Sequence, residues 1–173
     1  MLQPKTCWVL DDDHGNAVGY LLGVMDTRSF VQKYKDVYVP YLISKGLEEP
    51  GAHEPSDWDT NLPNALKKIM HHPEGSLHPD APDLIKNYPG HLHIDVLSSY
   101  QRQGYGRQLI CTMERRAKEM QTPGIHLLMA AANQEGKIFY PKVGFIRFPQ
   151  VLDDGDSGEE GRDKTTIWFV KTL

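Results

Sequence analysis

An alternating segment, two closely spaced glycines and a helical segment follow one another in this chain and limit the folds open to it. In HLHIDVL (91–97), apolar and polar residues alternate strictly, which is typical of a strand with one buried face. The next stretch, YQRQGYGRQLI (100–110), carries Gly104 and Gly106 and leads into a helix predicted over residues 104–120. The apolar stripe of that helix consists of Leu109, Ile110, Met113, Ala117 and Met120. A strand, a glycine turn and a helix in this order predict an α/β domain.

The glycine turn suits a phosphate or pyrophosphate group. Backbone N–H groups at a helix start are unpaired, and the helix dipole adds partial positive charge there. Gly104 and Gly106 lack the Cβ atoms that would block close approach, and Arg102 and Arg107 add charge at the rim. A GxG pair alone also serves simply to start a helix. Two common phosphate loops are excluded, because Leu109 replaces the third glycine of G-x-G-x-x-G and no G-K-[ST] follows.

The other segments predict more strands and helices around one sheet. Strands are expected at 6–12, 17–27, 125–131, 144–148 and 164–173, and helices at 29–46, 62–73 and 133–143, the first of these helices interrupted by Pro40. Residues 153–163 form an acidic segment that we interpret as a solvated loop. Residues 30–89 form a long helical and loop insertion between two strands. We therefore expect one mixed α/β (α+β) domain over residues 1–173.

Composition narrows the classes of partner and compartment. The net charge of −4 gives no support for nucleic acid as a partner. No stretch approaches the roughly 20 apolar residues of a membrane helix, and the N-terminus does not read as a signal peptide. The two cysteines imply no disulfide framework, which favours a reducing compartment, the cytoplasm or the nucleus.

Two motifs resemble those of the GNAT superfamily of acetyltransferases. Residues 101–106, QRQGYG, match the Q/R-x-x-G-x-G/A motif of that superfamily. Further on, NQEGKIFYPKVGF (133–145) is similar to the second motif, with an Asn, a Phe-Tyr pair and a Gly-Phe pair. Within the superfamily, GYLLGVMDTRSF, HHP and YPGHLHIDVL resemble the acetyltransferase-like domain that also occurs at the C-terminus of O-GlcNAcase enzymes.

The resemblance implies a fold and a co-substrate. The fold is a central mixed, mostly antiparallel, twisted sheet, flanked by helices and splayed at the cofactor site. The co-substrate is acetyl-CoA, with its pyrophosphate on the glycine turn and its pantetheine arm along the strand that contains Ile94 and Val96. The cofactor-binding residues implied are Ile94, Val96, Arg102, Gln103, Gly104, Tyr105, Gly106, Arg107, Asn133 and Tyr140.

The implied activity is N-acetyl transfer to an amine acceptor by direct attack in a ternary complex. Tyr140 is the expected general acid for the departing thiolate, although a Tyr after a Phe in an amphipathic helix also suits core packing. Asn133 is expected to contact the cofactor arm and is also well suited to cap a helix. An acetyl-CoA-binding module with little or no turnover is the alternative function.

The sequence leaves the general base open. His91, His93 and Asp95 share one face of the predicted strand, and such a row of polar groups needs an explanation. One hypothesis is a His–Asp relay beside the acceptor, with His93 and Asp95 as catalytic residues. The other is a hydrogen-bonded cluster against the insertion, reaching His71 or His72. Asp26, at the end of the preceding strand, is a further candidate.

A metal site is not expected, because no clear third ligand accompanies the histidines. The superfamily commonly starts with a strand and one or two helices that are not recognised before CWVL, near the start of this chain. We expect either that the chain is shortened there or that a second copy, in a homodimer, covers the exposed sheet edge.

Overall fold

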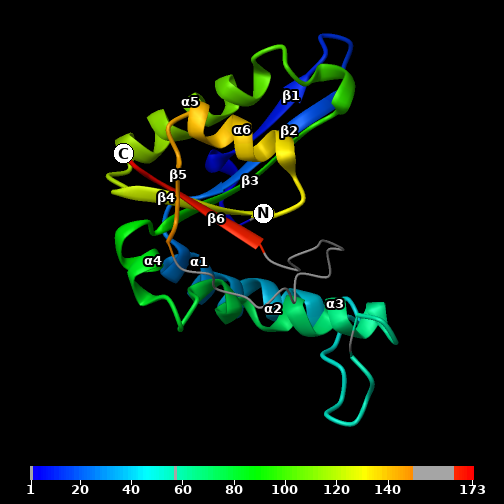
Figure 1. Ribbon diagram of the computed structural model, residues 1–173. Helices are drawn as coiled ribbons and strands as arrows, with labels where there is room; N and C mark the ends of the chain where they lie inside the picture. Colours follow the sequence, from blue (N-terminus) through cyan, green and yellow to red (C-terminus); the bar gives the residue numbers. More distant parts are fainter. Residues whose placement is uncertain (1, 57, 150–165) are drawn as a thin grey trace.

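The computed structural model describes residues 2–56, 58–149 and 166–173 as a twisted sheet between two layers of helices (Figure 1). The strands are β1 Cys7–Asp11, β2 Ala17–Val24, β3 Gly90–Val96, β4 Gly124–Ala130, β5 Ile146–Arg147 and β6 Thr166–Thr172. The helices are α1 Thr27–Lys33, α2 Val39–Ser44, α3 Leu62–His71, α4 Pro82–Asn87, α5 Tyr105–Glu119 and α6 Gln134–Lys142. Short helical segments are η1 Pro4–Thr6, η2 Tyr34–Tyr38, η3 Pro73–Leu77 and η4 Ser98–Tyr100.

The strands lie in the order β1-β2-β3-β4-β6-β5. β1 and β2 form an antiparallel hairpin, and β3 pairs antiparallel with the other edge of β2. β3 and β4 run parallel, as the crossover through α5 requires, and β6 is antiparallel to both β4 and β5. The sheet is therefore mixed and mostly antiparallel, which confirms the predicted fold class.

The main core lies between the sheet and α5 with α6. Leu109, Ile110, Met113 and Ala117 of α5 are buried there, as the stripe predicts. Leu92 of β3 joins them, and Ile94 and Val96 pack against the cluster. Met120 is half-exposed instead, because α5 ends at Glu119 and the side chain lies beyond its last turn.

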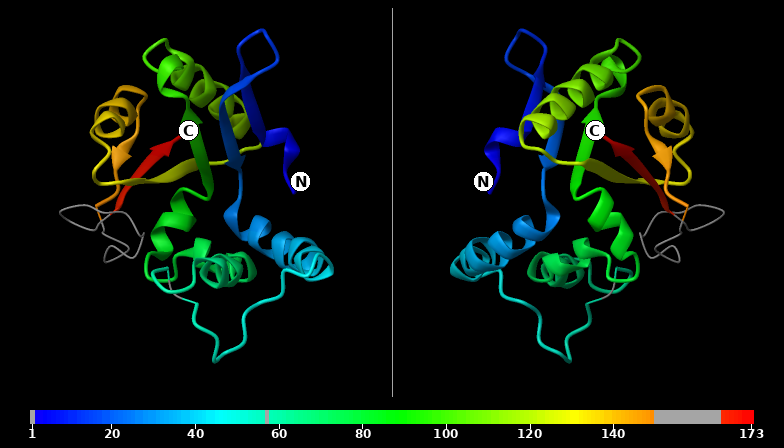
Figure 2. Two further views of the ribbon diagram at one scale, coloured as in Figure 1. Left: turned by 90° about the vertical axis from the view of Figure 1, so that its right-hand side faces the viewer. Right: turned by 90° about the vertical axis from the view of Figure 1, so that its left-hand side faces the viewer.

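The insertion covers the opposite face of the sheet. Figures 1 and 2 show α1 to α4 gathered on that side, away from α5 and α6. Residues 29–46 are not broken at Pro40, because α1 passes through the π-helical segment η2 and Pro40 then stands in the first turn of α2. A proline is tolerated in that position, since the N–H it lacks has no partner there.

The C-terminal part of the sheet departs from the prediction in one strand. Only Ile146 and Arg147 of the predicted 144–148 segment pair as a strand, against Val170 and Phe169 of β6.

The acidic segment 153–163 lies outside the described residues. Among the helices described, none has the length and apolar character needed to span a bilayer.

Candidate active site

The sheet opens between β3 and β4, and this opening organises the candidate site. The two strands pair at Gly90 with Ile125 and at His91 with His126, and the pairing goes no further. Figure 2 shows the strands diverging from that point. Leu97 N–H donates to the Val18 carbonyl at 2.9 Å, so by strand alternation the backbone groups of Ile94 and Val96 point away from β2 and into the opening.

Tight backbone packing fixes the closed end of the same strand pair. A Cβ atom on Gly124 would lie 2.6 Å from Tyr88 Cδ1 and 2.7 Å from the Asn87 carbonyl oxygen. At Gly90, a Cβ would lie 3.1 Å from the Val24 carbonyl oxygen. At Gly124 a side chain would collide with neighbouring backbone, and at Gly90 a Cβ atom would be tightly packed. The glycines therefore let this end of the strand pair pack closely against β2, β6 and the segment that follows α4.

The predicted phosphate turn lies directly beyond the open end of β3. Gly104 precedes α5 with φ of 89°, and no atom lies within 4 Å of the position its Cβ would take. Gly106 faces Phe139 of α6, whose ring a Cβ would approach to 3.2 Å. Tyr105 and Arg107 stand in the first turn of α5. A left-handed glycine at a helix start, with free space beside it, fits close approach of an anionic group.

Side chains of the turn also hold the loop itself. Gln101 Nε2 donates to the Val96 carbonyl at 2.7 Å, and Gln103 Nε2 donates to the Ser99 carbonyl at 2.9 Å. Arg102 forms an ion pair with Glu135 at the start of α6, and both side chains are mostly exposed. The rim charge expected from Arg102 is therefore shared with a carboxylate across the opening.

Helix α6 brings the second motif to the same opening. Asn133 Oδ1 accepts a 2.8 Å hydrogen bond from Gly136 N–H and so caps α6, which leaves its amide nitrogen outside the cap. Tyr140 packs its ring against Phe145 and Phe169, with centroid distances of 5.8 and 5.4 Å. Burial, aided by the negative charge of Asp95, raises the pKa of Tyr140 to about 12. Tyr140 therefore stays a neutral phenol that can donate a proton.

The structure does not assemble the His–Asp relay. His93 stacks on Tyr20, with ring centroids 5.7 Å apart and planes at 14°, and Asp95 is exposed on the same face. No hydrogen bond joins His93 to Asp95 within the part of the chain that the structure describes. Asp26 accepts a hydrogen bond from Ser29 N–H at 2.7 Å and so serves as the N-cap of α1.

His91 does face the insertion, but with other partners than the predicted ones. Its Nδ1 lies 2.7 Å from Thr27 Oγ1 in α1. His71 bonds the Leu47 carbonyl at 2.8 Å, and His72 pairs with Glu49 at 2.6 Å. The predicted cluster therefore does not form as expected: of His91, His93 and Asp95, only His91 lies toward the insertion, against Phe30, and its partners are neither His71 nor His72.

Sequence reasoning missed His126. This residue of β4 pairs with His91 across the closed end, with ring centroids 5.6 Å apart, and its Nδ1 lies 2.6 Å from the Tyr88 carbonyl. Burial lowers the pKa of His91 to about 3 and that of His126 to about 4, so both imidazoles are neutral at physiological pH. Alternation in IHLLMAA places His126 opposite the core face, but only the register brings it to His91.

Metal binding finds no support in the histidines. Within residues 2–56, 58–149 and 166–173, no three His, Cys, Asp or Glu side chains lie where they could hold one metal ion.

Comparisons with known proteins agree with the fold. Residues 77–147, which contain the glycine turn and α6, match the acetyltransferase (GNAT) domain family. Protein O-GlcNAcase of Rattus norvegicus is 24% identical over 140 residues, which cover 80% of this chain and only 14% of that protein. The chain therefore spans about one seventh of the length of this curated relative.

Solved structures extend the likeness across the chain. The crystal structure of SsHAT has 31% identity and a TM-score of 0.77, and the match covers 99% of this chain and 74% of that one. Naa20 of Chaetomium thermophilum, solved with a bisubstrate analogue, has 18% identity and a TM-score of 0.55, over 98% of this chain and 67% of that one. With both sequence motifs, the splayed sheet and these relatives in agreement, this chain belongs to the GNAT superfamily of acetyltransferases, and it resembles the acetyltransferase-like domain of O-GlcNAcase.

Proposed function

We propose that this protein is an acetyl-CoA-dependent N-acetyltransferase that transfers an acetyl group directly to an amine acceptor. The observation that supports the proposal most strongly is that three features with suitable chemistry lie around one opening in the sheet. The β4-facing backbone of Ile94 and Val96, the turn at Gly104 and the phenol of Tyr140 all border the opening between β3 and β4.

The residues present fit a long, anionic co-substrate. Gln103, Gly104, Tyr105, Gly106 and Arg107 offer the backbone of a helix start to its pyrophosphate, with Arg102 at the rim. The unpaired edge of β3 can bind an extended amide chain as an added strand would be bound, and the Asn133 amide is available beside it. Acetyl-CoA supplies the thioester whose carbon–sulfur bond breaks when the amine nitrogen bonds to the acetyl carbon.

Tyr140 then has a defined task in the proposal. The leaving thiolate needs a proton, and a neutral phenol at this position can provide it. The ring contacts with Phe145 and Phe169 hold the phenol in place. His93 and Asp95 stay candidates for the base only as separate groups, since the structure does not join them.

The first experiment tests co-substrate binding by isothermal titration calorimetry with acetyl-CoA. We expect saturable one-to-one binding that Gly104→Glu abolishes, because the carboxylate would stand where the phosphates bind. Gly46→Glu is the matched control, since Gly46 also has positive φ (72°) with no atom within 4 Å of its Cβ position. Equal binding by the wild type and Gly104→Glu would contradict the proposed phosphate site.

The second experiment separates an enzyme from a binding module. Tyr140→Phe keeps the ring packing but removes the proton donor, so we expect normal acetyl-CoA affinity and roughly 100-fold slower CoA release in the presence of an amine. Tyr41→Phe, at an exposed tyrosine of α2, is the control. A wild type that binds acetyl-CoA and acetylates no amine would favour the binding module.

A further inference from the structure

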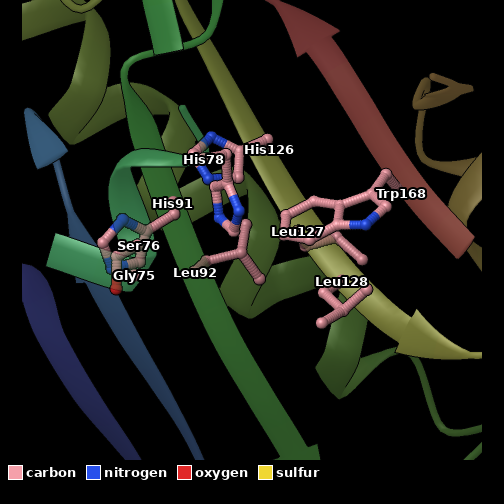
Figure 3. Close-up of a pocket in the computed structure, with 9 residues that line it drawn as sticks. All are labelled: Gly75, Ser76, His78, His91, Leu92, His126, Leu127, Leu128 and Trp168. Atoms are coloured by element: carbon pink, nitrogen blue, oxygen red, sulfur yellow. The ribbon is translucent and has the colours of Figure 1, made fainter. Parts of the chain in front are cut away.

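A pocket of about 270 Å³ lies beside β3 and β4, and Gly75, Ser76 and His78 of the insertion form part of its lining (Figure 3). Leu92 of β3 and Leu127 of β4 line it, and these residues follow the last paired residues of the two strands. The pocket therefore opens at the point where β3 and β4 part. A molecule inside it would face the opening from the side opposite α5.

The lining of this pocket is aromatic and apolar. His78, His91, His126 and Trp168 contribute rings, and His78 and Trp168 have centroids only 4.5 Å apart. Among residues 2–56, 58–149 and 166–173, no Asp, Glu, Lys or Arg side chain lines the pocket. Trp168 is 5% exposed, and its indole N–H has no hydrogen-bond partner among the described residues. A buried N–H donor in the lining is therefore left without an acceptor from those residues.

The hydrogen bonds of His91 and His126 fix their tautomers. The Thr27 hydroxyl donates to the Pro89 carbonyl at 2.7 Å, so it must accept from His91 Nδ1–H, also at 2.7 Å. The Tyr88 carbonyl can only accept, so His126 Nδ1 carries its proton too. Each ring therefore keeps an unprotonated Nε2, which is able to accept a hydrogen bond.

These observations discriminate between classes of acceptor. An ammonium ion or a second cationic group would lose its hydration in this pocket without gaining a carboxylate from the described lining. A neutral primary amine has N–H groups that suit the two Nε2 acceptors, and an aromatic body suits the ring-lined wall. Polyamines and lysine-rich peptides fit the lining poorly.

We propose, on the basis of the proposed acetyltransferase function, that this pocket binds the acceptor as the free base of a small aromatic monoamine. His91 and His126 act as positioning residues, each accepting an N–H of the amine through Nε2. Thr27 holds His91 in the required tautomer.

The kinetic test compares 2-phenylethylamine with spermidine at fixed, saturating acetyl-CoA and measures CoA release. We expect kcat/KM for 2-phenylethylamine to be at least about 10-fold higher, and to rise with pH in step with its free-base fraction. His91→Asn keeps a donor for Thr27 but lacks an Nε2 acceptor, so kcat/KM for the amine should fall about 30-fold while acetyl-CoA affinity is unchanged. The control is His53→Asn, at an exposed histidine of the loop before α3.

A second measurement detects amine binding in the pocket by NMR and does not depend on catalysis. We expect 2-phenylethylamine, added to the protein with CoA, to shift the side-chain ¹⁵N resonance of His91 Nε2 and to leave that of His53 unchanged. This shift in a protein that acetylates no amine would support the pocket and contradict the proposed function. Unchanged His91 and His126 resonances, a preference for spermidine, or wild-type kinetics in His91→Asn would overturn the pocket proposal.

Discussion

The two ends of the β3–β4 pair differ in what fills the space between the strands. At the closed end, a Cβ atom would collide with backbone at Gly124 and would be tightly packed at Gly90, and His91 lies against His126. At the open end, Ile94 and Val96 still pair with β2, but no strand among the described residues pairs with them on the β4 side. The same two strands thus provide rigid packing at one end and accessible backbone at the other.

Because of this difference, residues that stabilise the fold and residues that bind ligand lie at opposite ends of the β3–β4 pair. Substitutions at the closed end should destabilise the fold with little direct effect on a bound ligand. Substitutions at the open end should change ligand affinity with little effect on folding, because few native contacts are lost there. Each prediction below tests this separation.

The largest expected effect is that of Gly124→Ala at the closed end. The new methyl group would meet the backbone oxygens of Asn87 and Lys171, which cannot move aside as a flexible side chain could. We expect the free energy of unfolding to fall by about 3 kcal/mol, measured by urea unfolding at pH 7.5. Gly51→Ala, where only ordinary contacts with Glu54 arise, is the control. A loss below about 1 kcal/mol would show that the closed end is looser than its packing indicates.

The second-largest expected effect is a loss of folding stability in acid, caused by a histidine at the closed end. The pKa of His126 is lowered by folding, so the unfolded chain binds more protons, and stability present above pH 6.5 is lost as the pH falls toward 4. Between pH 6.5 and 5, we expect this residue to account for a loss of about 2 kcal/mol.

His126→Asn tests the source of that loss, because it keeps a donor for the Tyr88 carbonyl and cannot titrate. Urea unfolding at pH 7 and pH 5 should give a smaller difference for His126→Asn than for the wild type. The contribution of His72 to the pH dependence of stability has the opposite sign, because Glu49 raises the pKa of His72. That pair is exposed and screened by solvent, so its contribution is small. Equal pH dependence in both proteins would exclude His126 as the acid-sensitive group.

The smallest effect is expected at the open end, from Glu135→Gln. The Arg102–Glu135 pair is largely exposed, so the free energy of unfolding should change by less than about 0.5 kcal/mol. Release of Arg102 should tighten acetyl-CoA binding roughly two- to fivefold by calorimetry, since the guanidinium becomes available to phosphate. Glu119→Gln removes a similar exposed pair with Arg116 at the far end of α5 and should leave binding unchanged. Weaker binding in Glu135→Gln would mean that the ion pair itself shapes the phosphate turn.

Hydrophobic periodicity in the sequence predicted a helix or strand correctly where a single periodicity accounts for the whole segment. Alternation in HLHIDVL gave β3, and the apolar stripe gave α5, because each period matches the geometry of its element. The prediction was wrong where two rules compete. At Pro40 a π-helical segment keeps the chain helical, and at Met120 the apolar periodicity extends one residue past the helix end.

The sequence by itself determined the strand, the glycine turn and the helix that follow one another from β3 to α5, because these depend on neighbours along the chain. It also determined the family, through motifs of fixed spacing. Tertiary structure decided which histidines meet. His91 and His126 lie on different strands, and the parallel register set by the α5 crossover places them side by side. The pocket beside them likewise depends on how the insertion folds over the sheet, and no local period in the sequence encodes that contact.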